Sequence, residues 1–146
     1  MQLRKEDERW KRDQRHTAYQ AMIRADMAHM AAGQAVRGER VTHADVLAPE
    51  LVGQCERAQE ESTAAVSLIE LCGPLRVLEA ARELHWAGEE VMHVFAFPTS
   101  QVGYESAESA VIARQYEAVK AFRSAARDAL GYSASEDWAP SQPPRP

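Results

Sequence analysis

Two pairs of side chains in this sequence have the spacing of metal ligands on one face of a helix. Glu90 precedes His93 by three residues, and Asp26 precedes His29 by the same interval. In four-helix bundles that hold two metal ions, two helices each carry such a carboxylate–x–x–imidazole pair, and the other two each add a carboxylate. The spacing therefore raises the question of a dinuclear metal centre inside a helical bundle.

The apolar residues around Glu90 and His93 predict that this pair points away from the core. A helix turns about 100° per residue. A wheel centred on Gly88 gathers six apolar side chains within roughly 60° of it: Val77, Ala81, Leu84, Val91, Met92 and Phe95. Glu90 and His93 then fall roughly 160° and 140° away, in opposite senses. Ligands of a bundle metal site must point inward from facing helices. We therefore interpret both residues as part of a solvated, charged outer face.

The other predicted helices do not supply the ligands that a dinuclear site would still need. Asp26 lies at the edge of the apolar stripe of its helix, and His29 lies further round. Glu108 is the one acidic residue near the inner face of the last predicted helix. A full site takes carboxylates from four helices and two imidazoles. The sequence therefore predicts neither a metal centre nor another cofactor.

Motifs of catalysis are also missing from the sequence. It has no glycine-rich phosphate loop and no CxxC, HExxH or GxSxG motif. Cys55 and Cys72 both fall on a predicted inner stripe, where a buried structural thiol is more common than a nucleophile. On one helix they would lie roughly 25 Å apart, too far for a disulfide bond. We therefore expect a protein that is not an enzyme and that keeps its thiols reduced.

Composition and charge narrow the class of protein further. The 146 residues suit one domain, and a hydrophobic share of 45% with a charged share of 27% is ordinary for a globular protein. The net charge of −5 argues against a general nucleic-acid binder. No apolar run approaches the ~20 residues of a membrane span, and the polar start of the chain does not resemble a secretory leader. We therefore expect a cytoplasmic protein.

Helix-forming and helix-breaking residues predict an all-α fold, a bundle of four antiparallel helices with short connections. The helices are expected to span about residues 1–36, 49–72, 74–96 and 104–130. Gly73-Pro74 separates the second helix from the third, and Gly131 ends the fourth. Residues 1–131 would form one domain, and the proline-rich residues 132–146 a disordered tail.

One apolar stripe on each predicted helix would face the core. On the first helix the stripe is expected at Tyr19, Ile23, Met27 and Met30. On the last helix the stripe is expected to begin at Ala107. Gly88 lies on the stripe of the third helix, where the missing side chain would let a neighbouring helix come close.

The start of the first helix has a different character. Residues 1–16 are mostly charged, with Leu3 and Trp10 as the large apolar side chains. Such a helix is solvated and gains little from its own ion pairs, so we expect it to project from the bundle or to pair with a partner. Trp10, Arg12 and Arg15 form one predicted interaction surface on it.

A second predicted interaction surface lies on the outer face of the third helix. It contains Trp86, Glu90 and His93, and aromatic residues are enriched at interfaces. Trp86 also begins a W-x-G signature like that of small secreted helical hairpins, and residues 132–136 resemble the tail signal that accompanies it. In those hairpins the tryptophan lies in the turn, whereas the helical pattern around Trp86 continues in register. A WxG-type secreted protein is therefore the weaker alternative.

The methionines support another alternative, a bundle that binds a small apolar ligand. Their flexible side chains can adapt to such a ligand, although they fill cores more often. The cavity would be lined by residues of the first and third helices: Met22, Met27, Met30, Met92 and Phe95.

Three segments of the chain resemble small helical proteins of actinobacteria whose function is uncharacterised. They are residues 9–19 with an R-W-x-x-x-x-R pattern, residues 71–84 with LCGPLRV, and residues 122–131. In that family a membrane segment usually precedes the R-W-x-x-x-x-R helix, and some members are named for plasmid transfer or spread. The resemblance implies a cytoplasmic helical domain, but this sequence lacks the membrane segment of the family. We therefore expect either a soluble protein or the cytoplasmic part of a longer one. It implies no catalytic residue.

Taken together, these patterns predict a non-enzymatic helical protein that acts by protein–protein interaction. The partner would be another protein or a second copy of the chain, so that a homo-oligomer is expected. The setting implied by the resemblance is the inner face of a membrane.

Overall fold

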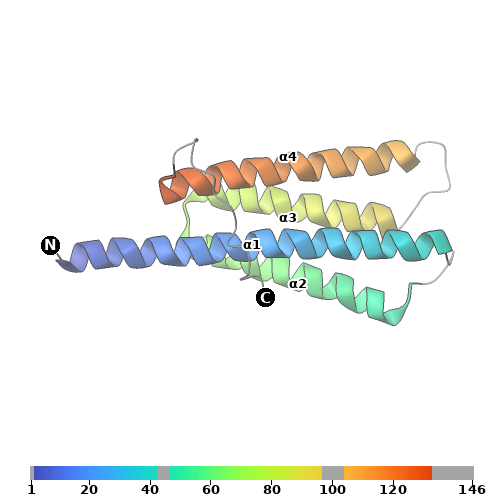
Figure 1. Cartoon of the computed structure of the whole chain (residues 1–146), viewed down its shortest axis with the longest axis horizontal. Helices are drawn as coiled ribbons and strands as arrows, with labels where there is room; N and C mark the ends of the chain where they lie inside the picture. The colour runs from blue at the N-terminus through green and yellow to red at the C-terminus, as the bar shows by residue number, and fades with distance from the viewer. Residues whose placement is uncertain (1, 43–46, 97–103, 133–146) are drawn as a thin grey trace, which may run out of the picture.

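Four helices make up the described part of the chain (Figure 1). The computed structural model describes residues 2–42, 47–96 and 104–132, without the side chains of 40–42 and 104–106. The helices are α1 (Gln2–Thr42), α2 (Pro49–Cys72), α3 (Leu75–Ala96) and α4 (Tyr104–Leu130). These ranges contain no β-strand, so the predicted all-α fold of four helices is confirmed. The predicted tail lies, from residue 133 onward, outside the described residues.

Successive helices run antiparallel, and α1 and α3 form the centre of the bundle (Figure 1). The helix α2 packs on both of them, whereas α4 packs on α3 and only lightly on α1. Within the described residues α2 and α4 make no contact. The bundle is therefore flattened around the α1–α3 pair. Among the described helices, none combines the length and the apolar character that crossing a membrane would need.

The buried line of α1 differs from the predicted stripe. It follows a three-and-four spacing through Tyr19, Met22, Asp26, His29, Gly33 and Val36. Met27, predicted to face inward, is 65% exposed, and Ala107 of α4 is exposed as well. Tyr19 and Ile23 of the predicted stripe are buried and Met30 is half-buried, so the prediction for α1 was wrong at Met27. It followed apolar residues alone. Two polar residues, Asp26 and His29, occupy the seam that the helix presents to its neighbours.

Glycines bring α1 and α3 close together at two points of this seam. A Cβ atom on Gly33 would lie 3.2 Å from the Phe95 ring and 3.3 Å from Cγ1 of Val91. A Cβ atom on Gly88 would lie 2.6 Å from Nδ1 of His29. Each helix therefore has a glycine where the other inserts a larger side chain. The close approach predicted at Gly88 is confirmed, and the neighbour is α1.

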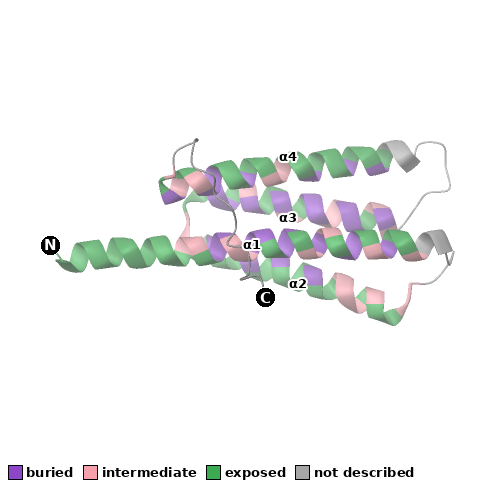
Figure 2. Ribbon diagram, viewed as in Figure 1, coloured by how far each residue is buried: buried purple, intermediate pink, exposed green. Residues whose placement is uncertain are grey.

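Apolar side chains fill the space between the helices in three clusters (Figure 2). The largest joins the middle of α1 to the second half of α2, the start of α3 and the end of α4. In it Tyr19 meets Phe122 edge to face, with 6.2 Å between the ring centroids. The second cluster is built around Phe95 and the third around Met92. Because burying one large apolar side chain stabilises the fold by about 1.5–3 kcal/mol, these clusters supply most of the cohesion of the bundle.

The first third of α1 extends beyond the other helices (Figures 1 and 2). Every side chain from residue 2 to residue 14 is exposed, and we call this stretch the projecting segment. At 1.5 Å per residue it is about 20 Å long. At its other end α1 continues to Thr42, past the end predicted near residue 36. The helix tolerates Gly33 because the glycine packs inside the bundle, against α3.

Side chains of α1 hold the end of α2. The hydroxyl of Tyr19 donates a 2.8 Å hydrogen bond to the carbonyl of Gly73, and Nε of Arg15 donates one of 3.1 Å to the carbonyl of Cys72. Carbonyl groups at a helix end have no partner inside the helix, so these bonds satisfy them. Burial raises the pKa of Tyr19 to about 12, which keeps the hydroxyl protonated as a donor.

Gly73 has φ of 48° and ψ of −166°, a backbone conformation that is strained for any residue but glycine. Gly73→Ala is therefore expected to lower the free energy of unfolding by about 1–3 kcal/mol. Gly38→Ala is the matched control, because a Cβ atom there would meet no atom within 4 Å. That substitution should leave the free energy unchanged or raise it by up to about 1 kcal/mol. Urea unfolding followed by circular dichroism measures both, and equal stabilities would contradict the role given to Gly73.

Candidate functional site

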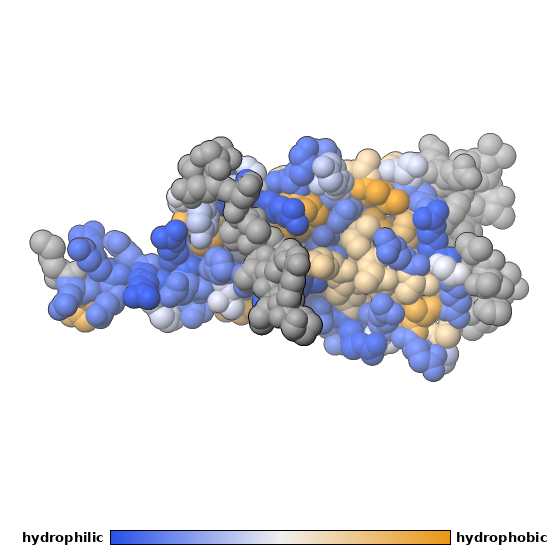
Figure 3. All heavy atoms as spheres, in the orientation of Figure 1, coloured by the Kyte–Doolittle hydropathy of each residue, from blue (hydrophilic) through white to orange (hydrophobic). Residues whose placement is uncertain are grey.

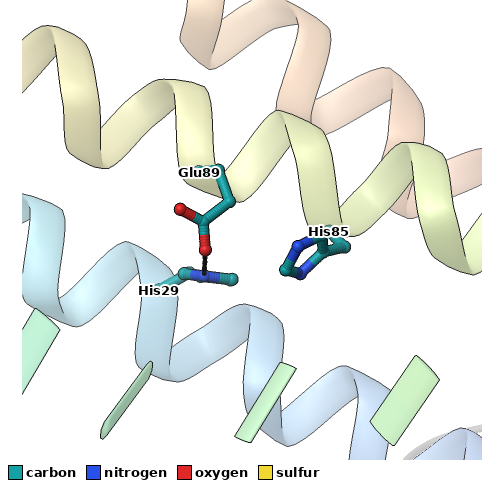
Figure 4. Close-up of side chains that lie close together, drawn as sticks. All are labelled: His29, His85 and Glu89. Carbon is teal, nitrogen blue, oxygen red and sulfur yellow. Dashed lines mark hydrogen bonds and ion pairs between the residues drawn. The ribbon is translucent and has the colours of Figure 1, made fainter. Parts of the chain in front are cut away.

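Three side chains with metal-binding or acid–base chemistry meet inside the bundle (Figure 4). His29 comes from α1, whereas His85 and Glu89 come from α3, one helical turn apart. One nitrogen of each imidazole and one carboxylate oxygen lie within 4.8 Å of one another. His29 is fully buried and the other two are half-buried. These three residues, here called the histidine–glutamate cluster, therefore lie at the edge of the core.

Gly88 makes the space that the cluster occupies. A Cβ atom at this position would lie 2.6 Å from Nδ1 and 2.9 Å from Cγ of His29. Real Cβ atoms do not come so close, so any side chain here would displace the imidazole. The ring of His29 therefore packs directly on the backbone of α3. This contact explains how a polar side chain on α1 reaches His85 and Glu89.

The helix α2 supplies hydrogen-bond partners to two members of the cluster. Nε2 of Gln59 donates a 2.6 Å hydrogen bond to one carboxylate oxygen of Glu89. The other oxygen of Glu89 lies 3.2 Å from Nε2 of His29. The hydroxyl of Ser62, fully buried, lies 2.7 Å from Nδ1 of His85. The helices α1, α2 and α3 therefore all take part in fixing the orientation of these groups.

Burial determines the charge of the titratable groups around the cluster. It lowers the pKa of His85, a shift that Glu89 opposes and that His29 reinforces. His85 is therefore neutral at pH 7 and keeps a lone pair on one ring nitrogen. Burial also raises the pKa of Cys55 and of Cys72. Both thiols stay protonated and are poor nucleophiles, which agrees with a structural role although both are only half-buried.

The two residues of the predicted pair on α1, Asp26 and His29, bond to different neighbouring helices. Both carboxylate oxygens of Asp26 accept hydrogen bonds from Nε2 of Gln115 on α4, at 2.9 and 3.0 Å. Burial raises the pKa of Asp26, and the bonds to Gln115 oppose that shift. His29 contacts α3 instead. It was predicted to lie outside the buried face of α1, and this was wrong because His29 is part of that face. Glu108, also buried, forms a 2.7 Å ion pair with Arg37.

The second predicted pair, Glu90 and His93, does not belong to the cluster. Glu90 forms an ion pair with Arg114 of α4, and His93 is exposed. Trp86 is 65% exposed, and its ring meets that of His85 edge-on at 5.3 Å between centroids. Trp86 lies inside α3, unlike the turn tryptophan of the W-x-G hairpins. The outer face of α3 thus carries the residues that the wheel placed on it.

The five residues predicted to line an apolar cavity do not surround a common space. Met22, Phe95 and Met92 each belong to a different apolar cluster, and Met30 packs beside the cluster of Phe95. Met27 is exposed, on the side of α1 that faces away from the core. The cavity prediction is therefore corrected: these side chains fill the core or face solvent, because the buried seam of α1 passes beside Met27.

A groove of about 530 Å³ lies where the projecting segment of α1 meets the end of α2. Trp10, Leu68 and Leu71 give it apolar walls. Two other residues were predicted for this surface. Arg15 donates a hydrogen bond to the carbonyl of Cys72 at the end of α2. The guanidinium of Arg12 lies 5.6 Å from the ring centroid of Tyr132, which follows α4. Both arginines therefore contact other parts of the chain, Arg12 although it is exposed, and Trp10 is the large apolar side chain that the predicted set leaves exposed.

Sequence reasoning missed His85 and Glu89 as a functional pair. They are four residues apart and flank Gly88, a position already expected to admit a neighbouring helix. Ser62 carried a second signal, since it is a polar residue on the apolar stripe of α2. The carboxylate–x–x–imidazole spacing drew attention to Glu90 instead, one residue further along.

Comparison with known proteins finds no relative of this chain. No protein-family model, no curated protein and no solved structure matches the chain. Function must therefore be inferred from the side chains themselves.

The lowered pKa of His85 predicts how stability depends on pH. The unfolded chain takes up a proton at this histidine near pH 6.5, whereas the folded protein does so only at lower pH. Unfolding therefore becomes more favourable as the pH falls below about 6.5. Between about pH 7.5 and 5.5 the wild type should lose more unfolding free energy than His85→Gln, which cannot take up this proton. Urea unfolding with EDTA in the buffer tests this, and parallel pH dependences would contradict it.

Proposed function

We propose that this chain is a non-enzymatic helical protein that acts through protein–protein contact, and that its partner is a second copy of itself. The observation that carries the proposal is the apolar groove between the projecting segment of α1 and the end of α2. Exposed apolar side chains that gather at one place are typical of interfaces, whereas single ones are common on any surface.

The groove has the composition of an interface. Leu71 is 85% exposed, Trp10 61% and Leu68 46%, and all three line the same groove. Leu3, also exposed, precedes Trp10 by seven residues and so lies on the same face of α1 two turns earlier. Tryptophan in a groove of this kind is a frequent energetic centre of binding. The groove, and Leu3 beyond it on the same face of α1, offer separate apolar contact points to another helix.

Charge supports a second copy as the partner. The projecting segment, residues 2–14, contains five basic and four acidic side chains, a net charge of +1, while the whole chain has −5. The rest of the chain therefore carries −6, and the slightly basic segment of one copy is attracted to the acidic body of another. Figure 3 shows the projecting segment as mostly hydrophilic, with apolar atoms more extensive over the bundle. Two copies that exchange the same segment would form a symmetric, closed dimer.

The projecting segment also gains from a partner for a reason of helix physics. An isolated helix of about a dozen residues is marginal in water, and exposed ion pairs such as Lys11–Asp7 add only a few tenths of a kcal/mol. Packing against a second helix would bury Leu3 and Trp10 and stabilise the segment.

Trp86 marks the other predicted surface, but its surroundings fit an interface less well. It borders a hollow of about 300 Å³ together with Glu83, Glu90 and Arg114. The charged groups include an ion pair that already satisfies Glu90. Charged side chains are depleted at interface centres, so we assign the main contact to the groove at Trp10.

The proposal also includes a setting, a cytoplasmic protein near the inner face of a membrane in a system related to plasmid transfer. Its support is the resemblance of residues 9–131 to the actinobacterial helical proteins. The acidic net charge supports a protein partner over a nucleic acid.

Substitution of Trp10 tests the proposed interface. We expect the wild-type chain to be dimeric by light scattering over a range of concentrations, and Trp10→Ser to weaken self-association about 30-fold or more, as for a tryptophan at an interface centre. Trp86→Ser is the matched control, since Trp86 is exposed to a similar extent, and it should leave self-association unchanged. Both variants should keep the circular dichroism spectrum of the wild type. A chain that stays monomeric throughout, or one dissociated only by Trp86→Ser, would contradict the proposal.

A further inference from the structure

We propose that His29, His85 and Glu89 bind a single transition-metal ion of the zinc class. This site differs from the dinuclear centre considered from the sequence, because its ligands come from two helices and Glu90 and His93 take no part.

The donor set is the first argument. Two imidazole nitrogens and one carboxylate oxygen are a ligand set that zinc sites use when a fourth position is open to water or another ligand. Zinc–nitrogen and zinc–oxygen bonds of about 2.0–2.2 Å place tetrahedral ligand atoms roughly 3.3 Å apart. Nε2 of His29 lies 3.2 Å from the nearer oxygen of Glu89. All three ligand atoms lie within 4.8 Å of one another, so small rotations of the half-buried side chains would complete the site.

The hydrogen bonds from α2 are the second argument. Histidine ligands of metals usually bond through their other ring nitrogen to a polar group, and ligating carboxylates are held in the same way. Ser62 engages Nδ1 of His85, and Gln59 engages the carboxylate oxygen of Glu89 that faces away from His29. When Nδ1 of His85 carries the proton and donates it to Ser62, the lone pair of Nε2 is left for an ion. The outer partners therefore present one nitrogen and one oxygen as ligand atoms.

The environment of His29 is the third argument. Its imidazole is fully buried, and Nδ1 has no hydrogen-bond partner among the described atoms. Nε2 is therefore the nitrogen through which this ring interacts, and it points at Glu89. A cation held by the two imidazoles and the carboxylate would offset the negative charge of Glu89 at the edge of the core.

A bound ion would join the two central helices of the bundle. Its ligands come from α1 and α3, and the groups that orient them come from α2. An ion that binds only the folded chain raises the free energy of unfolding. Once the ion concentration exceeds the dissociation constant, this gain grows with the logarithm of the concentration. Zinc should therefore raise the unfolding temperature progressively as its concentration rises.

The experiment uses the full chain, freed of metal by dialysis against a chelator and titrated with zinc chloride in a calorimeter. We expect one zinc ion per chain, with a dissociation constant in the micromolar range or tighter, and a rise in unfolding temperature that depends on zinc concentration. Cobalt chloride supplies an independent probe, because tetrahedral cobalt with nitrogen and oxygen ligands has characteristic visible absorption.

Four variants locate the site. His85→Gln and Glu89→Gln each remove a ligand and should weaken zinc binding more than 10-fold, and Ser62→Ala should weaken it about 10- to 100-fold, as for other outer-partner substitutions. His93→Gln is the control, because it removes an exposed imidazole of the same helix and should leave the affinity unchanged. Circular dichroism verifies that each variant is folded. No stoichiometric zinc binding, or binding that His93→Gln removes and His85→Gln leaves intact, would overturn the proposal.

Discussion

The contact between the imidazole of His29 and the backbone of Gly88 determines how the two central helices pack. A Cβ atom on Gly88 would come within 2.6 Å of that ring, so the separation of α1 and α3 at this level depends on the missing side chain. One helical turn further along α1, Gly33 receives the ring of Phe95 from α3 in the same manner. The two contacts fix the register of α1 on α3, because a shift of either helix would drive a side chain into a backbone. The other two helices then pack on the two sides of this pair.

Polar groups on this seam restrict the register further. Asp26 bonds to Gln115 of α4, and His29 bonds to Glu89 of α3, so two polar residues of α1 each have one specific partner. A buried polar group without its partner costs about 1–3 kcal/mol, which penalises any packing in which these pairs do not meet. A single polar residue in a helical seam is known to select one register in the same way. The interior of the bundle is thus more specific than an apolar interior of the same size would be.

Most of the fold could be predicted from the sequence, because helix boundaries depend on local residues. Gly73-Pro74 and the apolar spacing on α3 were sufficient to place the helices, and Gly88 was correctly expected to admit a neighbour. The seam of α1 could not be found by the same reasoning. Met27 is apolar and exposed, while His29 is polar and buried, so a count of apolar residues assigns both to the wrong side.

The candidate sites were harder to predict than the fold for a related reason. The histidine–glutamate cluster depends on which residue of α1 faces Gly88, and that is a property of the packing of two helices far apart in the sequence. His85 and Glu89 carry no motif that indicates such a neighbour by itself. Trp10, in contrast, could be recognised as exposed because the helix around it is charged on every side. Leu68 and Leu71 joined it only when the end of α2 was placed beside α1.

The apolar groove and the histidine–glutamate cluster both include residues of α1, at different positions along the helix. Its projecting segment carries the exposed tryptophan on which the proposed self-association rests, while its middle holds an imidazole against α3. Since the helix is continuous between them, an ion that fixes the middle of α1 also anchors the base of the projecting segment. The register of α1 on α3 therefore underlies both the interior cluster and the position of the outer groove.

The most direct test of this register is a thermodynamic cycle between His29→Ala and Gly88→Ala, measured by urea unfolding with EDTA in the buffer. In the wild-type background Gly88→Ala should lower the free energy of unfolding, because the new Cβ atom displaces the imidazole. In the His29→Ala background the ring is gone, and the same substitution should raise the free energy by up to about 1 kcal/mol, the helix preference of alanine over glycine. An effect of the same sign and size in both backgrounds would contradict the packing of His29 on Gly88.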